Sequence, residues 1–278
     1  MTAQSQKTIQ YVYHFRYNDG REKKFTVELD EHTLAVIRPD QPELPEWTRL
    51  KFSQCENCPL SDAVSHCPVA VNLARVVDAF RADVSYETSD ITVETPQRTY
   101  VKNTTLQKGL SSIIGVYMVT SDCPILDKLR PMSRFHLPFA TPVETFFRSI
   151  SSYLTAQFLL MRQQKEPDWS LKKLIEIYKA INIVNRGMSQ RLMKASQKDA
   201  NVNALVILHS FGDGIGYFIE SGLDEIEPMF AVYLNESNGE VRASPPDPDA
   251  EGHSGPQAGV GGKSHAPAED GRPESAST

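Results

Sequence analysis

All four cysteines of this 278-residue chain fall in two places, and this distribution restricts the folds that the chain can adopt. Cys55, Cys58 and Cys67 form a C-x2-C-x8-C run, and Cys123 follows after a long interval. A C-x2-C pair lets two thiolates bind one metal ion from a tight turn, while the other ligands come from elsewhere in the fold. We therefore predict one metal site formed by all four cysteines. Such a site requires the segment around Cys123 to lie against the Cys55–Cys67 loop.

Proline directly follows Cys58, Cys67 and Cys123. Proline is favourable at the first position of a helix, so Cys67 and Cys123 are expected at helix N-caps. There the free backbone N–H groups and the positive end of the helix dipole favour a thiolate. A thiolate binds metals and is also the reactive form of cysteine, so redox chemistry remains an alternative. Four separately buried cysteines that pack as small apolar side chains are the other alternative.

The cysteines leave the identity of the metal open. Zinc uses closed sets of four thiolates, and we favour zinc because a structural ion requires nothing further of its surroundings. Cys-Pro pairs also occur beside iron–sulfur clusters, which makes such a cluster the alternative cofactor. His66, next to Cys67, is a further candidate ligand.

Alternating apolar residues in the first part of the chain predict β-hairpins. The alternation runs over residues 7–29 on both sides of Asn18-Asp19-Gly20, whose glycine suits a tight turn. A second hairpin is expected over 84–102, and a short helix after Pro68 separates the two. The cysteine-rich loop precedes that helix.

Helical spacing of apolar residues dominates the later part of the chain. Thr141-Pro142-Val143-Glu144 predicts a helix start, because a Thr N-cap, a first-turn proline and a Glu three residues after the cap occur together. The Met and aromatic stripe of that helix, over 143–161, is expected to be core. Other helix starts are expected from a capping-box pattern at Thr104–Gln107, from Asp168, and over 201–211 and 223–234, with a turn or helix break at Gly212–Gly216.

These patterns predict an α+β fold with N-terminal β-hairpins and a Cys-rich loop, followed by a mainly helical C-terminal half. We expect one mixed α/β domain over 1–240. Residues 241–278 contain 6 of the 15 glycines and 6 of the 18 prolines, with almost no large apolar side chain. Such a segment cannot bury enough surface to offset the entropy of ordering, so a disordered tail is expected there.

A second group of polar residues lies just after Cys123. Arg130, Arg134 and His136 occur close together among prolines, and Arg148 follows on the next expected helix. These four side chains are a candidate anion-binding site. The alternative is that the arginines pair with carboxylates and brace the loop against the core.

Charge and hydropathy limit the classes of partner. The net charge of −6, from 35 acidic and 29 basic residues, argues against an extended nucleic-acid or anionic-membrane surface. No secretory signal is visible at the N-terminus. The longest aliphatic run, Ala204–Leu208, is far shorter than the roughly 20 residues of a membrane span. A cytoplasmic protein is therefore expected, and reduced thiols there favour metal binding over disulfides.

Several runs of residues resemble a known bacterial family. They begin at Cys55 (CENCPL), His66 (HCPVAVNL), Thr104 (TTLQ), Ser121 (SDCP), Leu129 (LRPMSRFHLPFA) and Pro167 (PDWSL). The chain resembles the domain of unknown function DUF6901 over roughly residues 7–235. The resemblance implies a bacterial cytoplasmic protein and brings no activity, ligand or catalytic residue with it.

Two functions follow from these observations. The first is a non-enzymatic regulatory or adaptor protein that is stabilised by the metal. The second is an iron–sulfur or metal-dependent redox enzyme that uses Arg130, Arg134 and His136 to hold an anionic substrate. The sequence does not decide between an enzyme and a binding module, and it indicates no particular partner.

Overall fold

The computed structural model describes residues 7–38 and 43–236 of the chain. The chain divides into two compact units, the second of which begins at Ile226. In place of the single helix expected over 223–234, the described part of the second unit holds η4 (Glu227–Phe230) and α7 (Ala231–Glu236). The tail expected over 241–278 lies outside the described residues, as does the expected domain boundary at 240.

The N-terminal part of the first unit is a four-stranded antiparallel sheet, which confirms both predicted hairpins. Gly20 takes a φ of +88° in the first turn, and its N–H donates to the Tyr17 carbonyl at 3.1 Å. The strand order is β2-β1-β3-β4. The strands are β1 (Thr8–Tyr17), β2 (Glu22–Asp30), β3 (Thr88–Glu94) and β4 (Thr99–Thr105).

One face of the sheet is buried under helices. Alternate residues of β1, such as Tyr13 and Phe15, are fully buried. Helix α2 (Leu106–Val119) approaches the sheet closely at Gly109, where a Cβ atom would stand 2.2 Å from the Ile91 side chain. Helix α1 (Pro68–Ala79) ends at Phe80, whose ring lies 4.9 Å from that of Phe15. The α+β class is confirmed, with the sheet first and a mostly helical part after it.

The expected capping box at the start of α2 is wrong. Thr105 is the N-cap, and its side chain makes no capping hydrogen bond. The first N–H groups of α2 are satisfied by carbonyl oxygens instead, from Leu106 to Glu87 at 2.8 Å and from Gln107 to Ser85 at 3.1 Å. Backbone acceptors from the segment just before β3 therefore replace the side-chain cap.

Helix α4 (Pro142–Arg162) starts as predicted. Thr141 and Glu144 form a complete capping box, with the Thr141 N–H donating to Glu144 Oε2 at 2.7 Å. The stripe expected to be core is buried only in part, at Phe146 and Ile150. Phe146 packs on Phe218 with ring centroids 5.0 Å apart, whereas Phe158 is 49% exposed. The spacing of the aromatic residues predicted the apolar face of the helix correctly. It did not predict how much of that face other elements bury.

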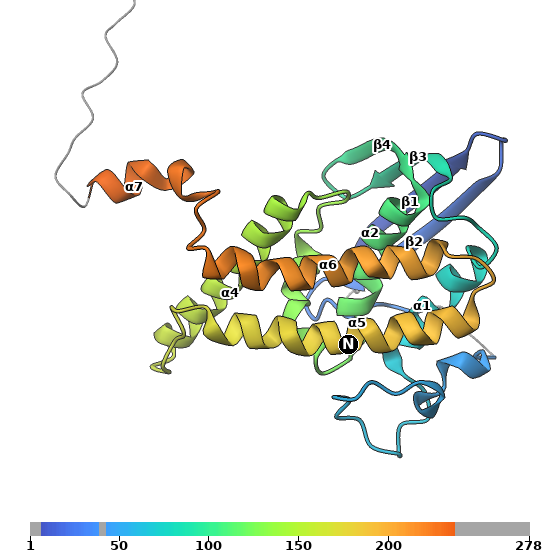
Figure 1. Cartoon of the computed structure of the whole chain (residues 1–278), viewed down its shortest axis with the longest axis horizontal. Coiled ribbons are helices and arrows are strands. Elements are labelled where there is room, and N and C mark those ends of the chain that lie inside the picture. The colour runs from blue at the N-terminus through green and yellow to red at the C-terminus, as the bar shows by residue number, and fades with distance from the viewer. Residues whose placement is uncertain (1–6, 39–42, 237–278) are drawn as a thin grey trace, which may run out of the picture. The chain divides into compact units, whose positions relative to one another are not determined.

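Helices α5 (Lys172–Ala195) and α6 (Ala200–Glu220) run side by side (Figure 1). The expected break at Gly212–Gly216 is wrong, because α6 continues through it. These glycines permit close packing: a Cβ at Gly212 would stand 2.0 Å from Asn182 of α5, and one at Gly214 would stand 2.7 Å from Phe146. By length and composition α6 could cross a membrane, and a core helix of a soluble protein passes the same test.

Short elements complete the first unit. Two of them, η1 (Glu46–Thr48) and η2 (Leu50–Phe52), lie just before the cysteine-rich loop. The other two, η3 (Leu126–Leu129) and α3 (Pro131–Arg134), follow Cys123 and lead to α4. Both regions that the sequence singled out are therefore loops with short helices, held against longer ones.

Candidate functional site

Helix α5 carries a buried arginine that the sequence analysis did not single out. Arg191 is 1% exposed, and no carboxylate pairs with it in the described part of the chain. Its Nη atoms donate instead to the backbone carbonyls of Trp47 (2.5 Å), Arg49 (2.7 Å), Leu50 (3.1 Å) and Ser53 (2.8 Å). Arg191 therefore fastens the segment before Cys55 to α5.

The C-x2-C turn lies on the same helix. The Cys58 N–H donates to the Cys55 carbonyl at 3.0 Å, which closes the turn, and Asn57 donates from Nδ2 to the Ala180 carbonyl at 2.8 Å. Cys55 packs against Gly187, where a Cβ atom would stand 2.7 Å from Sγ. Only glycine leaves room for the cysteine at this point of α5, one turn before Arg191.

The other two cysteines are buried at different backbone positions. Cys67 is the N-cap of α1, as predicted, and its N–H donates to the Thr48 carbonyl at 2.8 Å. The expected N-cap role of Cys123 is wrong, because Ile125 occupies the N-cap of η3. Backbone N–H groups of Ile125 and Leu126 nevertheless hydrogen-bond to Cys123 and favour its thiolate, although burial still raises the pKa of this thiol overall.

The four free thiols share one region of the fold. Burial raises the pKa of Cys55 to about 12, and the thiols of Cys67, Cys58 and Cys123 act in the same direction. Burial lowers the pKa of Arg191, and three of the cysteines oppose that effect. Across residues 7–38 and 43–236, no three His, Cys, Asp or Glu side chains are placed so that they could hold one metal ion.

His66, the additional candidate ligand, is bonded to the short helix η1. Its Nδ1 lies 2.8 Å from the hydroxyl of Thr48, which itself donates to the Pro45 carbonyl at 2.6 Å. His66 also forms an isolated antiparallel bridge with Arg49. These contacts hold η1 beside the residues that lead into Cys67.

The structure does not gather the four candidate anion-binding residues into one site. Arg130 pairs with Asp122 at 2.9 Å and with Asp127 at 2.5 Å. Arg134 lies 3.7 Å from Glu31. Only His136 and Arg148 line a common cavity.

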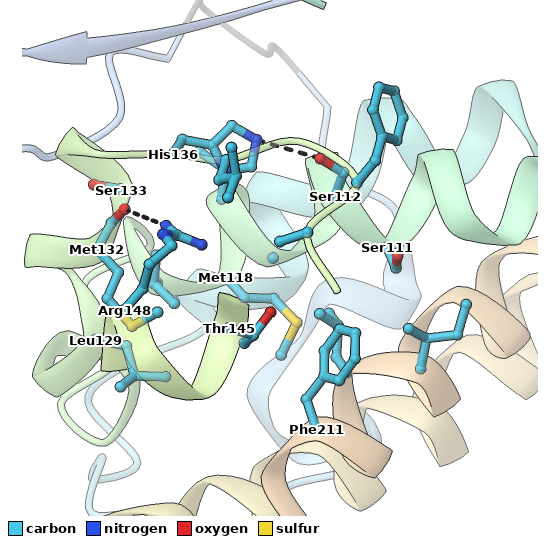
Figure 2. Close-up of a pocket in the computed structure, with 18 of the residues that line it drawn as sticks. Ser111, Ser112, Met118, Leu129, Met132, Ser133, His136, Thr145, Arg148 and Phe211 are labelled. Atoms are coloured by element: carbon cyan, nitrogen blue, oxygen red, sulfur yellow. Dashed lines mark hydrogen bonds between the residues drawn. The ribbon is translucent and has the colours of Figure 1, made fainter. Parts of the chain in front are cut away.

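This cavity, of about 480 Å³, lies among β4, α2, the η3–α4 segment, α5 and α6. Its wall is largely apolar and contains no Asp or Glu side chain among the described residues. Figure 2 shows Met118 and Phe211 on one side and Arg148 and Met132 on another. The sequence could not reveal this cavity, because its lining comes from segments far apart in the chain.

His136 is an uncharged part of the cavity wall. Its Nε2 lies 2.5 Å from the Tyr13 hydroxyl. The same atom lies 3.3 Å from the Ser112 hydroxyl (Figure 2). Burial, and to a smaller extent the charge of Arg148, lowers the pKa of His136 to about 3. The ring is therefore neutral at physiological pH and contributes hydrogen bonds, not charge.

Arg148 reaches the cavity from α4, and only one of its three guanidinium nitrogens donates a hydrogen bond within the described residues. Its Nη2 donates to the carbonyls of Met132 at 3.1 Å and Phe135 at 2.9 Å. No ion pair of Arg148 exists within the described residues, and the Glu144 carboxylate is engaged by Thr141. Burial lowers the pKa of Arg148, and nearby groups, among them Glu144, oppose that effect in part.

Comparison with known proteins identifies the family and nothing finer. The model of the family described as Domain of unknown function (DUF6901) matches residues 9–231. No curated protein matches the chain, and no solved structure matches it. The chain belongs to the DUF6901 family.

Proposed function

We propose that Cys55, Cys58, Cys67 and Cys123 bind one metal centre with a structural role. The protein is then a non-enzymatic regulatory or adaptor module that works in a reducing compartment such as the cytoplasm. The proposal rests on one observation. Three buried or half-buried free thiols, those of Cys58, Cys67 and Cys123, lie near enough to Cys55 to raise its pKa, and Arg191, which has no carboxylate partner among the described residues, is buried beside this group.

The buried positive charge of Arg191 would be stabilised by a negatively charged group beside it. A buried guanidinium is costly unless it is paired, and carbonyl dipoles offset only part of that cost. Four thiolates around one zinc ion form a centre with net negative charge. Without a metal the pKa of Cys55 stays near its value of about 12, so this thiol is neutral at physiological pH and offers Arg191 no charge. Metal binding would therefore stabilise Arg191 as well as the loop.

The positions of the cysteines support a structural role for the centre. They come from the C-x2-C turn, the start of α1 and the segment after α2, which the centre would tie together. If all four ligands are protein thiolates, no position remains open for a substrate, which is typical of structural sites. Binding free energy at such a site contributes directly to folding.

Zinc is the ion we favour, and an iron–sulfur cluster is the second candidate. The specific observation behind the second candidate is that the thiols share one region although, within the described residues, no three are placed around a single ion. A cluster of several iron and sulfide ions holds its thiolates farther apart than one zinc ion does.

Anaerobic purification with metal analysis and a visible spectrum tests the proposal. We expect a colourless protein with about one zinc ion per chain. A brown protein with iron and acid-labile sulfide would favour the second candidate. Cys58→Ser should lose the metal. Substitutions of surface residues other than cysteine should keep it. A full-length protein that contains neither metal after purification and reconstitution would refute the metal centre.

A further inference from the structure

The cavity beside α2 has the size and the wall of a small-molecule site. Its volume of about 480 Å³ lies within the roughly 300–1,000 Å³ that is typical of ligand pockets. Side chains such as Met118, Leu208 and Phe211 supply an apolar wall. Gly115 of α2 also lines it, and a Cβ atom there would make an ordinary contact with Leu208 at 3.5 Å. The apolar part of a ligand with more than a few carbon atoms could pack against this wall.

The charged side chains that line the cavity are all cationic, and the Glu144 carboxylate, which is not a lining residue, interacts electrostatically with Arg148 and Lys102. Lys102, Lys108 and Arg148 are lining residues, and no carboxylate is among the described residues that line it. The protein as a whole is acidic, with a net charge of −6, so this concentration of cations is local. A positive, partly enclosed surface raises the local concentration of anions.

Arg148 supplies the contact that would orient an anion. Its Nη2 donates to two backbone carbonyls, and neither Nε nor Nη1 has a hydrogen-bond partner within the described residues. A guanidinium with free donors matches the planar carboxylate group well. The neutral His136, with Ser112, lines the neighbouring wall without adding charge (Figure 2).

We propose that this cavity binds a fatty acid of medium chain length, with its carboxylate at Arg148 and its chain along the apolar wall between α2 and α6. None of the four cysteines lines the cavity, although Leu126 lines it and also hydrogen-bonds to Cys123. The proposal does not depend on the metal centre, and metal content is measured beside ligand binding to keep the two apart. The ligand class follows from the single guanidinium, the apolar wall and the lack of acidic lining residues.

Calorimetric titration of the full-length protein with laurate tests the proposal, and dodecanol is the matched neutral probe. We expect one laurate per chain, with dodecanol bound at least tenfold more weakly. Arg148→Gln should weaken laurate binding by at least tenfold, while Arg148→Lys, which keeps the charge, should lose less. Arg134→Gln, whose arginine pairs with Glu31, should leave laurate affinity unchanged.

A second variant tests the cavity itself. Thr145 lines it from α4, so Thr145→Phe should fill part of it and reduce laurate affinity, with the fold checked by circular dichroism. Equal affinity for laurate and dodecanol would refute the carboxylate contact at Arg148. No laurate binding by the folded wild-type protein, or unchanged binding in both Arg148→Gln and Thr145→Phe, would refute the site. Metal content is measured in the same samples, so that loss of the metal centre is recognised separately.

Discussion

Arg191 and Arg148 are two arginines held by backbone carbonyls, and the described residues give neither of them a carboxylate ion pair. Arg191 is 1% exposed and donates to four carbonyls, whereas half-buried Arg148 donates to two and faces a cavity. The surroundings of each arginine, and not the residue type, therefore decide its role. A guanidinium whose donors are mostly taken by the backbone fixes a loop. One with free donors beside a cavity is available to a ligand.

The largest effect is expected from Arg191→Leu. Four carbonyls would lose their donor in a buried place, so the free energy of unfolding should fall by about 4 kcal/mol or more. Denaturation in urea measures this loss. Arg49→Leu is the control, because Arg49 forms an exposed pair with Glu46 at 2.6 Å and should contribute less than about 1 kcal/mol. Similar losses in both variants would contradict the special place of Arg191.

Gly187→Ala should come next. The new methyl group would collide with Cys55 Sγ, at 2.7 Å, and with the Cys55 Cα, at 3.3 Å, and we expect a loss of about 1–3 kcal/mol. The metal content should fall as well, because the C-x2-C turn is displaced from α5.

Gly216→Ala in α6 is the matched control for this glycine. The nearest atom to its Cβ would be 4.0 Å away, so the substitution should stabilise the helix by up to about 1 kcal/mol. A Gly187→Ala protein as stable and as rich in metal as the wild type would show that Cys55 does not pack tightly on α5.

The pH dependence of stability should reveal the buried His136 in the cavity wall. The pKa of His136 is lowered from 6.5 to about 3 in the folded protein, so the unfolded chain binds a proton first as the pH falls. Stability is therefore lost progressively below pH 6.5, by about 2 kcal/mol between pH 6.5 and pH 5. Urea denaturation of wild type and His136→Gln at several pH values measures it. If both proteins lost stability equally over this range, His136 would not be the responsible group.

Arg148→Gln should have the smallest effect on stability. Water in the cavity can reach the two carbonyls that Arg148 releases, so we expect a loss of no more than about 1 kcal/mol. Thermal denaturation beside Arg191→Leu makes the comparison direct. A loss as large as that of Arg191→Leu would mean that both arginines brace the fold and that the proposed contrast is wrong.

Local patterns predicted the elements of this fold, and tertiary packing produced the errors. The hairpins and the capping box of Thr141 depend on neighbours in sequence, so they could be read correctly. Gly212 looked like a helix break because the sequence does not show that α5 passes close to it. Phe158 looked like core because the sequence does not show where α4 is left uncovered.

The site was harder to predict than the fold. The cysteine pattern predicted a four-thiolate centre, which stays a prediction, because no three possible ligands are placed around one ion in the described residues. Arg191 left one signal in the sequence: a charged residue at helical spacing from buried Met188 on the apolar stripe of α5. Lys102 and Lys108 left none, because the cavity that they line with Arg148 exists only when several elements pack together.

The most direct test of the metal centre is the urea midpoint of unfolding before and after metal removal, in wild type and in Cys123→Ser. We expect metal removal to lower the wild-type midpoint to that of Cys123→Ser and to leave this variant unchanged, because binding energy at the centre is folding energy. Arg134→Ala, which loses only a contact with Glu31 at 3.7 Å, should keep both its metal and its response to metal removal. A wild-type midpoint that does not move when the metal is removed, together with a Cys123→Ser protein of wild-type stability, would show that the four cysteines form no structural metal centre.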